Sequence, residues 1–162
     1  MNESELRSQL VHALRGDQAH MTFADAIAEF PDEHINTRPA SVPYSFWHLV
    51  EHLRITQRDI INYLEKADYE EIEWPKDYWP APDAEATRQQ WDDSVRQFTA
   101  DLEKLIALAG NESTDLTAPV PSHDGHTVLR EILIIANHNS YHTGELAILR
   151  QIAGAWGPSH ET

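Results

Sequence analysis

Hydrophobic positions recur at helical spacing along most of the chain. The first stripe predicts a helix over residues 4–15 that ends at Gly16, and it consists of Leu6, Leu10 and Leu14. A short helix is expected over 23–30, because Thr22 and Asp25 have the spacing of a capping box and Pro31 follows. Residues 31–44 contain three prolines, so we expect a loop there.

Three longer stripes follow. They predict helices over about residues 45–66, with Ser45 as N-cap, from near Asp83 to Gly110, and over about 127–153. Residues 68–82 are expected to form an ordered, aromatic-rich loop, and a polar loop precedes the last helix. No segment alternates strictly with a period of two, so we expect no strands.

The arrangement of these stripes predicts an all-α fold. Four substantial helices joined by loops indicate a four-helix bundle with a short extra helix, and residues 1–162 suffice for one domain. The long connection between the first two long helices carries the short helix. We therefore expect a non-simple crossover connection rather than simple up-and-down wiring.

Composition narrows the function classes. The sequence contains no cysteine, which excludes disulfides, cysteine-based zinc sites and a cysteine nucleophile. A formal charge of −15 argues against nucleic-acid binding. No apolar run approaches the roughly 18–20 residues needed to cross a membrane, and the acidic N-terminus lacks the features of a signal peptide. We therefore expect a cytoplasmic protein with a small-molecule substrate.

Histidine spacing provides the candidate chemistry. The chain has ten histidines, so about half of one i, i+4 pair is expected by chance, and two occur, His48/His52 and His138/His142. The second pair lies between Ile134 and Leu146 on one predicted helix face, which should direct both imidazoles into the core.

Two buried imidazoles need partners for their nitrogens, and a divalent metal would supply one. His52, beside Leu49 and Leu53 on another helix, is the expected third ligand, whereas His48 lies nearer a surface loop. Three neutral imidazoles suit zinc, nickel, copper or iron(II). The alternative is a set of core histidines bonded to hydroxyls or water. Asn139 replaces the glutamate of an HExxH protease.

Other residues leave alternatives open. Glu145, one turn after His142, could be a fourth ligand, a general base, an orienting residue or an exposed helix glutamate. Glu145 and His48 are the candidates for proton handling. The aromatic loop around Trp74, Tyr78 and Trp79 is expected to be a tethered flap or dimer contact, with a ligand site as the alternative. The remaining histidines are expected on helix surfaces or in loops: His12, His20, His34, His123, His126 and His160.

Two segments resemble a known family. The stretch from Tyr44 to Ile55 (YSFWHLVEHLRI) is similar to the segment of the DinB-like (YfiT-like) superfamily that carries its first metal histidine. The stretch from Ala136 to Glu145 (ANHNSYHTGE) resembles its last-helix motif, AxHxxYHxGQ, except that Glu145 stands where relatives often have glutamine. The WPKDYWP loop at 74–80 resembles that of one largely uncharacterised branch.

The resemblance implies more than the residues alone. It implies a four-helix bundle with an unusual crossover, commonly a homodimer, and zinc or nickel held by His52, His138 and His142. Characterised members include metal-dependent transferases and isomerases that use an external low-molecular-weight thiol. Glu145 would add a negative charge beside a neutral three-histidine shell.

The leading hypothesis is a metal-dependent enzyme, because three histidines leave coordination positions open. Thiol-dependent transferase chemistry is favoured over metal-assisted hydrolysis only by the resemblance. The alternatives are a non-catalytic metal-binding stress or structural protein, and a small-ligand binding module that uses the aromatic loop.

Overall fold

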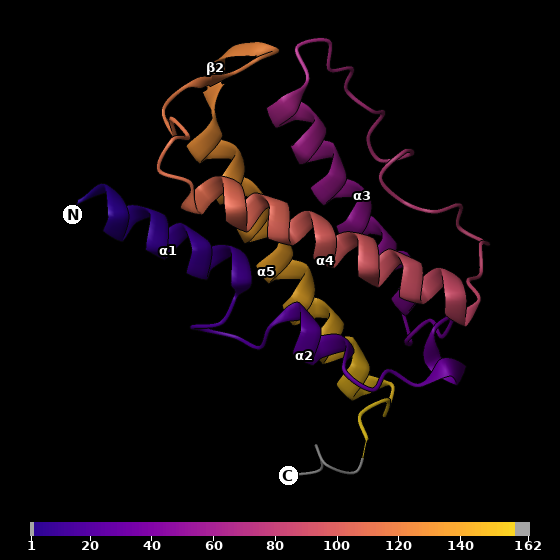
Figure 1. The fold of residues 1–162 in the computed structure, drawn as a ribbon. Coiled ribbons are helices and arrows are strands. Elements are labelled where there is room, and N and C mark those ends of the chain that lie inside the picture. Colours follow the sequence, from indigo (N-terminus) through magenta and orange to yellow (C-terminus); the bar gives the residue numbers. More distant parts are fainter. Residues whose placement is uncertain (1, 158–162) are drawn as a thin grey trace.

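Helices dominate the computed structural model, which describes residues 2–157. The four long helices are α1 (Glu3–Arg15), α3 (Phe46–Glu65), α4 (Arg88–Gly110) and α5 (Val128–Ile152). The connection from α1 to α3 carries the short helix α2 (Phe23–Ile27) and the 3-10 turn η1 (Asp32–His34). Strands β1 (Pro119–Val120) and β2 (His123–Thr127) form a small antiparallel hairpin before α5. The predicted helical bundle with a short extra helix is confirmed (Figure 1).

Capping side chains set where the helices begin. A side-chain oxygen ahead of each helix accepts a backbone N–H from its first turn, and these N-caps are Asn2, Thr22, Ser45, Thr87 and Thr127. Such a bond pairs one of the donors that a helix start leaves without a partner. Gly16 ends α1 with a φ of 68°, a left-handed conformation that glycine adopts without strain.

The long helices are joined by crossover connections, as expected. Among the long helices, α1 packs mainly against α4 and α5, and α3 packs mainly against the same two helices. Consecutive helices α1 and α3 therefore occupy opposite corners of the bundle, as do α4 and α5. In the view of Figure 1, α4 passes in front of α5. The loop that leads to α4 lies along the outside of α3.

Three details differ from the sequence expectations. Helix α2 ends at Ile27 rather than at residue 30, and the chain turns at Glu29, whose φ is 50°. Helix α4 begins at Arg88 rather than near Asp83, because the Asn36 side chain bonds both the N–H and the C=O of Ala86 and holds that segment outside the helix. The expected polar loop contains a hairpin too short to produce an alternating pattern.

The core has two apolar halves with polar side chains between them. One half surrounds Phe46, Trp91 and Leu146, and the other surrounds Leu10, Leu105 and Ile132. Between them, the Asn139 amide donates to Gln57, and Gln57 donates to the carbonyl of Phe98. His52 and His138 belong to the same stretches of α3 and α5.

None of the described helices is long and apolar enough to span a membrane.

Candidate metal centre

Three histidines from two helices converge beside this polar layer. His52 comes from α3, and His138 and His142 come from successive turns of α5. Their nearest ring nitrogens all lie within 4.8 Å of one another, and Nε2 of His52 is 3.1 Å from Nε2 of His138. Among the described residues this is the one group of histidine and acidic side chains with such spacing. The structure thus brings together the three predicted ligands in a cluster that could hold a metal ion.

The ring of His52 is fixed on its far side by the aromatic loop. Its Nδ1 lies 2.9 Å from the carbonyl oxygen of Tyr78. A carbonyl only accepts, so Nδ1 carries the proton and Nε2 presents a lone pair to the cluster. The indole of Trp79 stacks on the same ring, with centroids 3.9 Å apart and planes 4° apart. The ring is therefore held in the orientation and tautomer that a metal ligand needs.

His142 is oriented by a carboxylate. Its Nδ1 donates to Glu145 across 2.7 Å, and the Tyr44 hydroxyl donates to the other oxygen of Glu145. Burial opposes ionisation of Glu145, but the hydrogen bonds from His142 and Tyr44 outweigh it and hold the pKa of Glu145 below its ordinary value. The resulting carboxylate–imidazole pair leaves Nε2 of His142 free and strengthens it as a ligand.

His138 supplies the test of whether a metal fits. Its Nδ1 is buried without a hydrogen-bond partner among the described residues, while its Nε2 faces the lone pair of His52. Two facing nitrogens 3.1 Å apart need a proton or a cation between them. Metal–nitrogen bonds of about 2.0–2.1 Å in a tetrahedral site place two ligand nitrogens about 3.3 Å apart. The spacing of this pair therefore fits a shared ion.

Burial also keeps His52 and His138 neutral. Desolvation is the main cause that lowers the pKa of His52 to about 4 and that of His138 to about 4, and charge on His142 lowers both further. Neutral imidazoles are the form that binds transition metals, and a shell of three nitrogens does not suit calcium or magnesium.

The α5 pair lies at the edge of the core rather than inside it. Leu146 is fully buried, but Ile134, expected on the same buried stripe, is 39% exposed. His52 is buried, whereas His138 and His142 are partly exposed. The expectation that both α5 imidazoles point into the core is therefore wrong, because they are only partly buried at its edge. They face α3 and the aromatic loop, and His138 is open to solvent on one side.

His48 lies outside the three-histidine group. Its Nε2 is 3.0 Å from the carbonyl of Ala81 and its Nδ1 is 2.7 Å from the Ser45 hydroxyl. The carbonyl accepts a hydrogen bond from one ring N–H and the hydroxyl donates to the other nitrogen, so both nitrogens are occupied. This arrangement ties the start of α3 to the end of the aromatic loop. A role of His48 in proton handling stays a prediction.

The remaining histidines lie apart from the cluster. His20 and His123 are exposed, whereas His12, His34 and His126 are partly buried. His12 bonds Asp17, and His126 bonds the Tyr63 hydroxyl. His160 lies outside the described residues.

Sequence reasoning missed the residues that hold the ligands in place. The Tyr78 hydroxyl donates to buried Asp59 across 2.7 Å, and the Tyr69 hydroxyl donates to the same carboxylate. Tyr78 therefore connects Asp59 to His52 through its side chain and its carbonyl. Trp79 packs against Tyr44 at a centroid distance of 5.0 Å and so connects the His52 side to the Glu145 side. The aromatic spacing of the loop was the available signal, but the role of a backbone carbonyl has no sequence signature.

Comparison with known proteins identifies the family. A search of curated proteins finds no significant match, and a search of solved structures finds none either. A family model of the DinB superfamily matches residues 15–146, a span that includes α3, α4 and all three histidines. This match covers far more than half of the chain, and it agrees with the helical bundle and its histidine cluster. The chain therefore belongs to the DinB superfamily.

Proposed function

We propose that this protein is a metal-dependent enzyme that holds zinc or nickel on His52, His138 and His142 and acts on a small molecule. The observation that carries the proposal is the fixed orientation of the rings. His52 and His142 each donate Nδ1–H to an oxygen, so their free nitrogens converge beside His138. Three protein ligands leave a coordination position open, which is typical of catalytic rather than structural sites.

The surrounding residues have separate tasks. A bound divalent metal would supply Lewis acidity and lower the pKa of a thiol or water that reaches the site. The Tyr78 carbonyl orients His52, and Glu145 orients His142. Trp79 covers one face of His52 and excludes water from that side. His138 is the ligand on the open side, where a substrate would approach.

Thiol transfer is our preferred reaction, with hydrolysis as the alternative. In thiol transfer, the thiol gives its proton to solvent, its sulfur bonds to an electrophilic carbon, and the leaving group departs with its bonding electrons. The chain has no cysteine, so the thiol must be an external low-molecular-weight compound. The thiol-dependent enzymes of the superfamily support this choice, although kinship of fold alone does not fix a reaction.

We assign Glu145 an orienting role in the reaction. Both of its oxygens already accept hydrogen bonds, and its lowered pKa makes it a weak base. This arrangement favours positioning of His142 over direct proton transfer. It also preserves the negative charge of Glu145 beside the three-histidine cluster.

Metal analysis is the first experiment. Purified protein should contain about one transition-metal ion per chain, and His52→Ala should remain folded by circular dichroism but lose that ion. Metal-loaded protein should then conjugate an external thiol to electrophiles in a screen, whereas His52→Ala should not. A protein that takes up no metal after reconstitution would refute the site. Metal that raises the melting temperature without any turnover would indicate a structural protein instead.

A homodimer is also part of the proposal. Ile148 and Ile152, near the end of α5, are 63% and 62% exposed, and large exposed apolar side chains favour a contact surface. Light scattering coupled to size-exclusion chromatography should give twice the chain mass. Substitution Ile148→Glu should convert the dimer to a monomer with the metal retained.

A further inference from the structure

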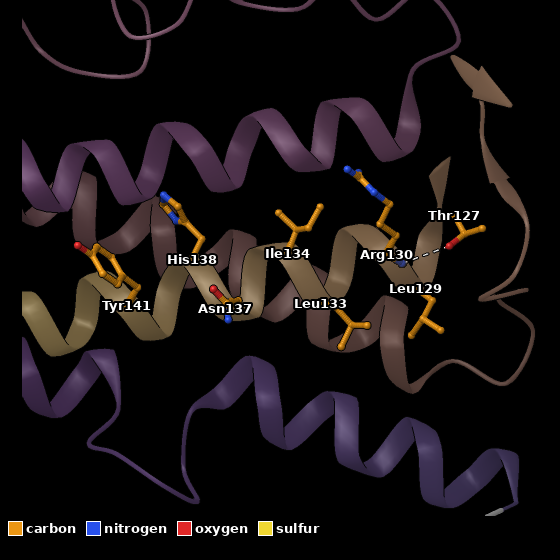
Figure 2. Close-up of a pocket in the computed structure, with 8 residues that line it drawn as sticks. All are labelled: Thr127, Leu129, Arg130, Leu133, Ile134, Asn137, His138 and Tyr141. Carbon is orange, nitrogen blue, oxygen red and sulfur yellow. Dashed lines mark hydrogen bonds between the residues drawn. The ribbon is translucent and has the colours of Figure 1, made fainter. Parts of the chain in front are cut away.

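A hollow of about 770 Å³ lies along the exposed side of α5 and reaches the metal centre. Its wall extends from the N-cap Thr127 to Tyr141, and Figure 2 shows the eight side chains that line it. His138 belongs both to this wall and to the three-histidine cluster. A molecule in the hollow would therefore lie directly beside one of the metal ligands.

Three of the lining residues form a row. Arg130, Ile134 and His138 are spaced at i, i+4 and i+8, so they lie above one another on one helix face. Figure 2 shows all three side chains on the side of α5 that faces α3. Eight helical residues span about 12 Å. The row thus offers a cation, an apolar contact and a metal ligand, in that order.

Arg130 can take an anionic group. One of its terminal nitrogens bonds the carboxylate of buried Glu131, and among the described residues this is the one partner of the guanidinium. The guanidinium has five N–H donors and the side chain is 46% exposed, so donors remain for a planar anion. Glu131 orients Arg130 and also offsets part of its charge.

The lining is unusual for so acidic a chain. Arg130 is the one charged side chain in the wall of the hollow, although the protein has 27 acidic and 12 basic residues. Between Arg130 and His138 the lining is apolar except for Asn137. Leu133 is 50% exposed, Ile134 is 39% exposed, and Tyr141 at the metal end is 69% exposed. Exposed apolar side chains around a single charged group are typical of ligand sites.

We propose that this hollow is the substrate site and that it accepts an organic acid with an apolar body. The carboxylate pairs with Arg130, the apolar body lies against Ile134 and Leu133, and the reacting end reaches the metal beside His138. The inference rests on the proposed function, because the reacting end requires a bound metal. It adds the substrate class and assigns Arg130 as its specificity-determining residue.

Mercapto-acids test the proposal by direct binding. The protein is reconstituted with Co²⁺ and titrated with ω-mercaptocarboxylates of increasing chain length, and the sulfur-to-cobalt absorption band reports each dissociation constant. Each carboxylate is compared with the mercapto-alcohol of equal length. We expect the carboxylate of the best length to bind about tenfold more tightly than its alcohol, as is typical of a hydrogen-bonded charge pair.

Variants then locate the effect. Arg130→Gln should abolish the preference for the carboxylate while the mercapto-alcohol still binds as before, which also shows that the variant is folded. Arg130→Lys retains the charge and should keep part of the preference. Arg96→Gln removes an exposed arginine from α4 and is the matched control that should behave as the original protein.

The outcomes separate this inference from the proposed function. A protein that takes up no cobalt would overturn the metal site itself. Cobalt uptake and a normal thiol band, with equal affinity for acid and alcohol, would overturn the substrate assignment and leave the metal site intact. A dimer that Leu133→Glu converts to a monomer, together with absent carboxylate preference, would show that a second copy of the chain covers the hollow, and it too would overturn the assignment.

Discussion

The two i, i+4 histidine pairs of this protein have the same spacing and different surroundings. On α5, His138 and His142 both face the cluster, one turn apart. On α3, His52 joins them, whereas His48, one turn earlier, has both nitrogens occupied by Ser45 and Ala81. The same motif therefore provides two candidate ligands in one helix and only one in the other.

The difference lies in what each ring's second nitrogen meets. In His52 and His142, one ring nitrogen donates its N–H to an oxygen and the other nitrogen is left free. In His48, a carbonyl acceptor and a hydroxyl donor together use both nitrogens, so none is left for a metal. Spacing on a helix determines which way a histidine points, but the hydrogen-bond partners determine whether it is a ligand.

Removal of a metal ligand should have the largest effect. His52→Ala should abolish retention of a stoichiometric metal ion during gel filtration, because two imidazoles on one helix remain without their facing ligand. His48→Ala is the matched control, since it removes the other member of the same pair. Elemental analysis of both variants measures the result. Equal metal content in the two would contradict the assignment of His52.

Loss of the orienting carboxylate should have the next largest effect. Glu145→Ala should weaken metal affinity by about 10–100-fold, the usual cost of removing a group that orients a ligating histidine. Tyr44→Phe, which removes only the hydrogen bond to Glu145, should cause a smaller loss in the same direction. Competition with a chromogenic chelator measures the affinities. Unchanged affinity in Glu145→Ala would show that His142 does not depend on this carboxylate.

His48 should matter for stability rather than for metal. His48→Ala should lower the free energy of unfolding by about 1–3 kcal/mol, because the Ala81 carbonyl loses its donor in a partly buried position. Urea denaturation of the metal-free protein gives the value. His20→Ala removes an exposed histidine and serves as the control for a change of histidine alone. Loss of the bound metal in His48→Ala, with an unchanged free energy of unfolding, would instead give His48 a place in the site.

Acid should lower the stability of the metal-free protein through the buried histidines. The pKa values of His52 and His138 are about 4 when folded, mainly because of burial, against about 6.5 in an unfolded chain. Between these values the unfolded chain binds more protons, so this contribution to stability is complete above about pH 6.5 and is lost as the pH falls toward 4. Melting temperatures in chelator should therefore drop from pH 7 to pH 5, and by less in His52→Phe. An equal drop in both would place the acid sensitivity elsewhere.

Much of the fold was predictable because its signals are local. Heptad-like stripes and capping residues such as Thr22 and Ser45 depend on neighbours within one or two turns, and the structure confirms both caps. The errors arose where a distant residue intervened. Asn36 binds Ala86 across 50 positions and delays the start of α4, which no pattern near residue 83 could reveal.

The helical bundle and the three converging histidines follow from local patterns, because apolar periodicity sets the helix faces and the faces set which side chains converge. The long connection before α3 indicated the crossover. Long-range packing, in contrast, sets the orientation of two rings by Tyr78 and Glu145 and the hydrogen bonds that hold His48. It also leaves Ile134 open onto a hollow with Arg130 at its far end. These features depend on contacts between segments far apart in the chain, on a backbone carbonyl and on which side of α5 is left uncovered. None of these has a local signature.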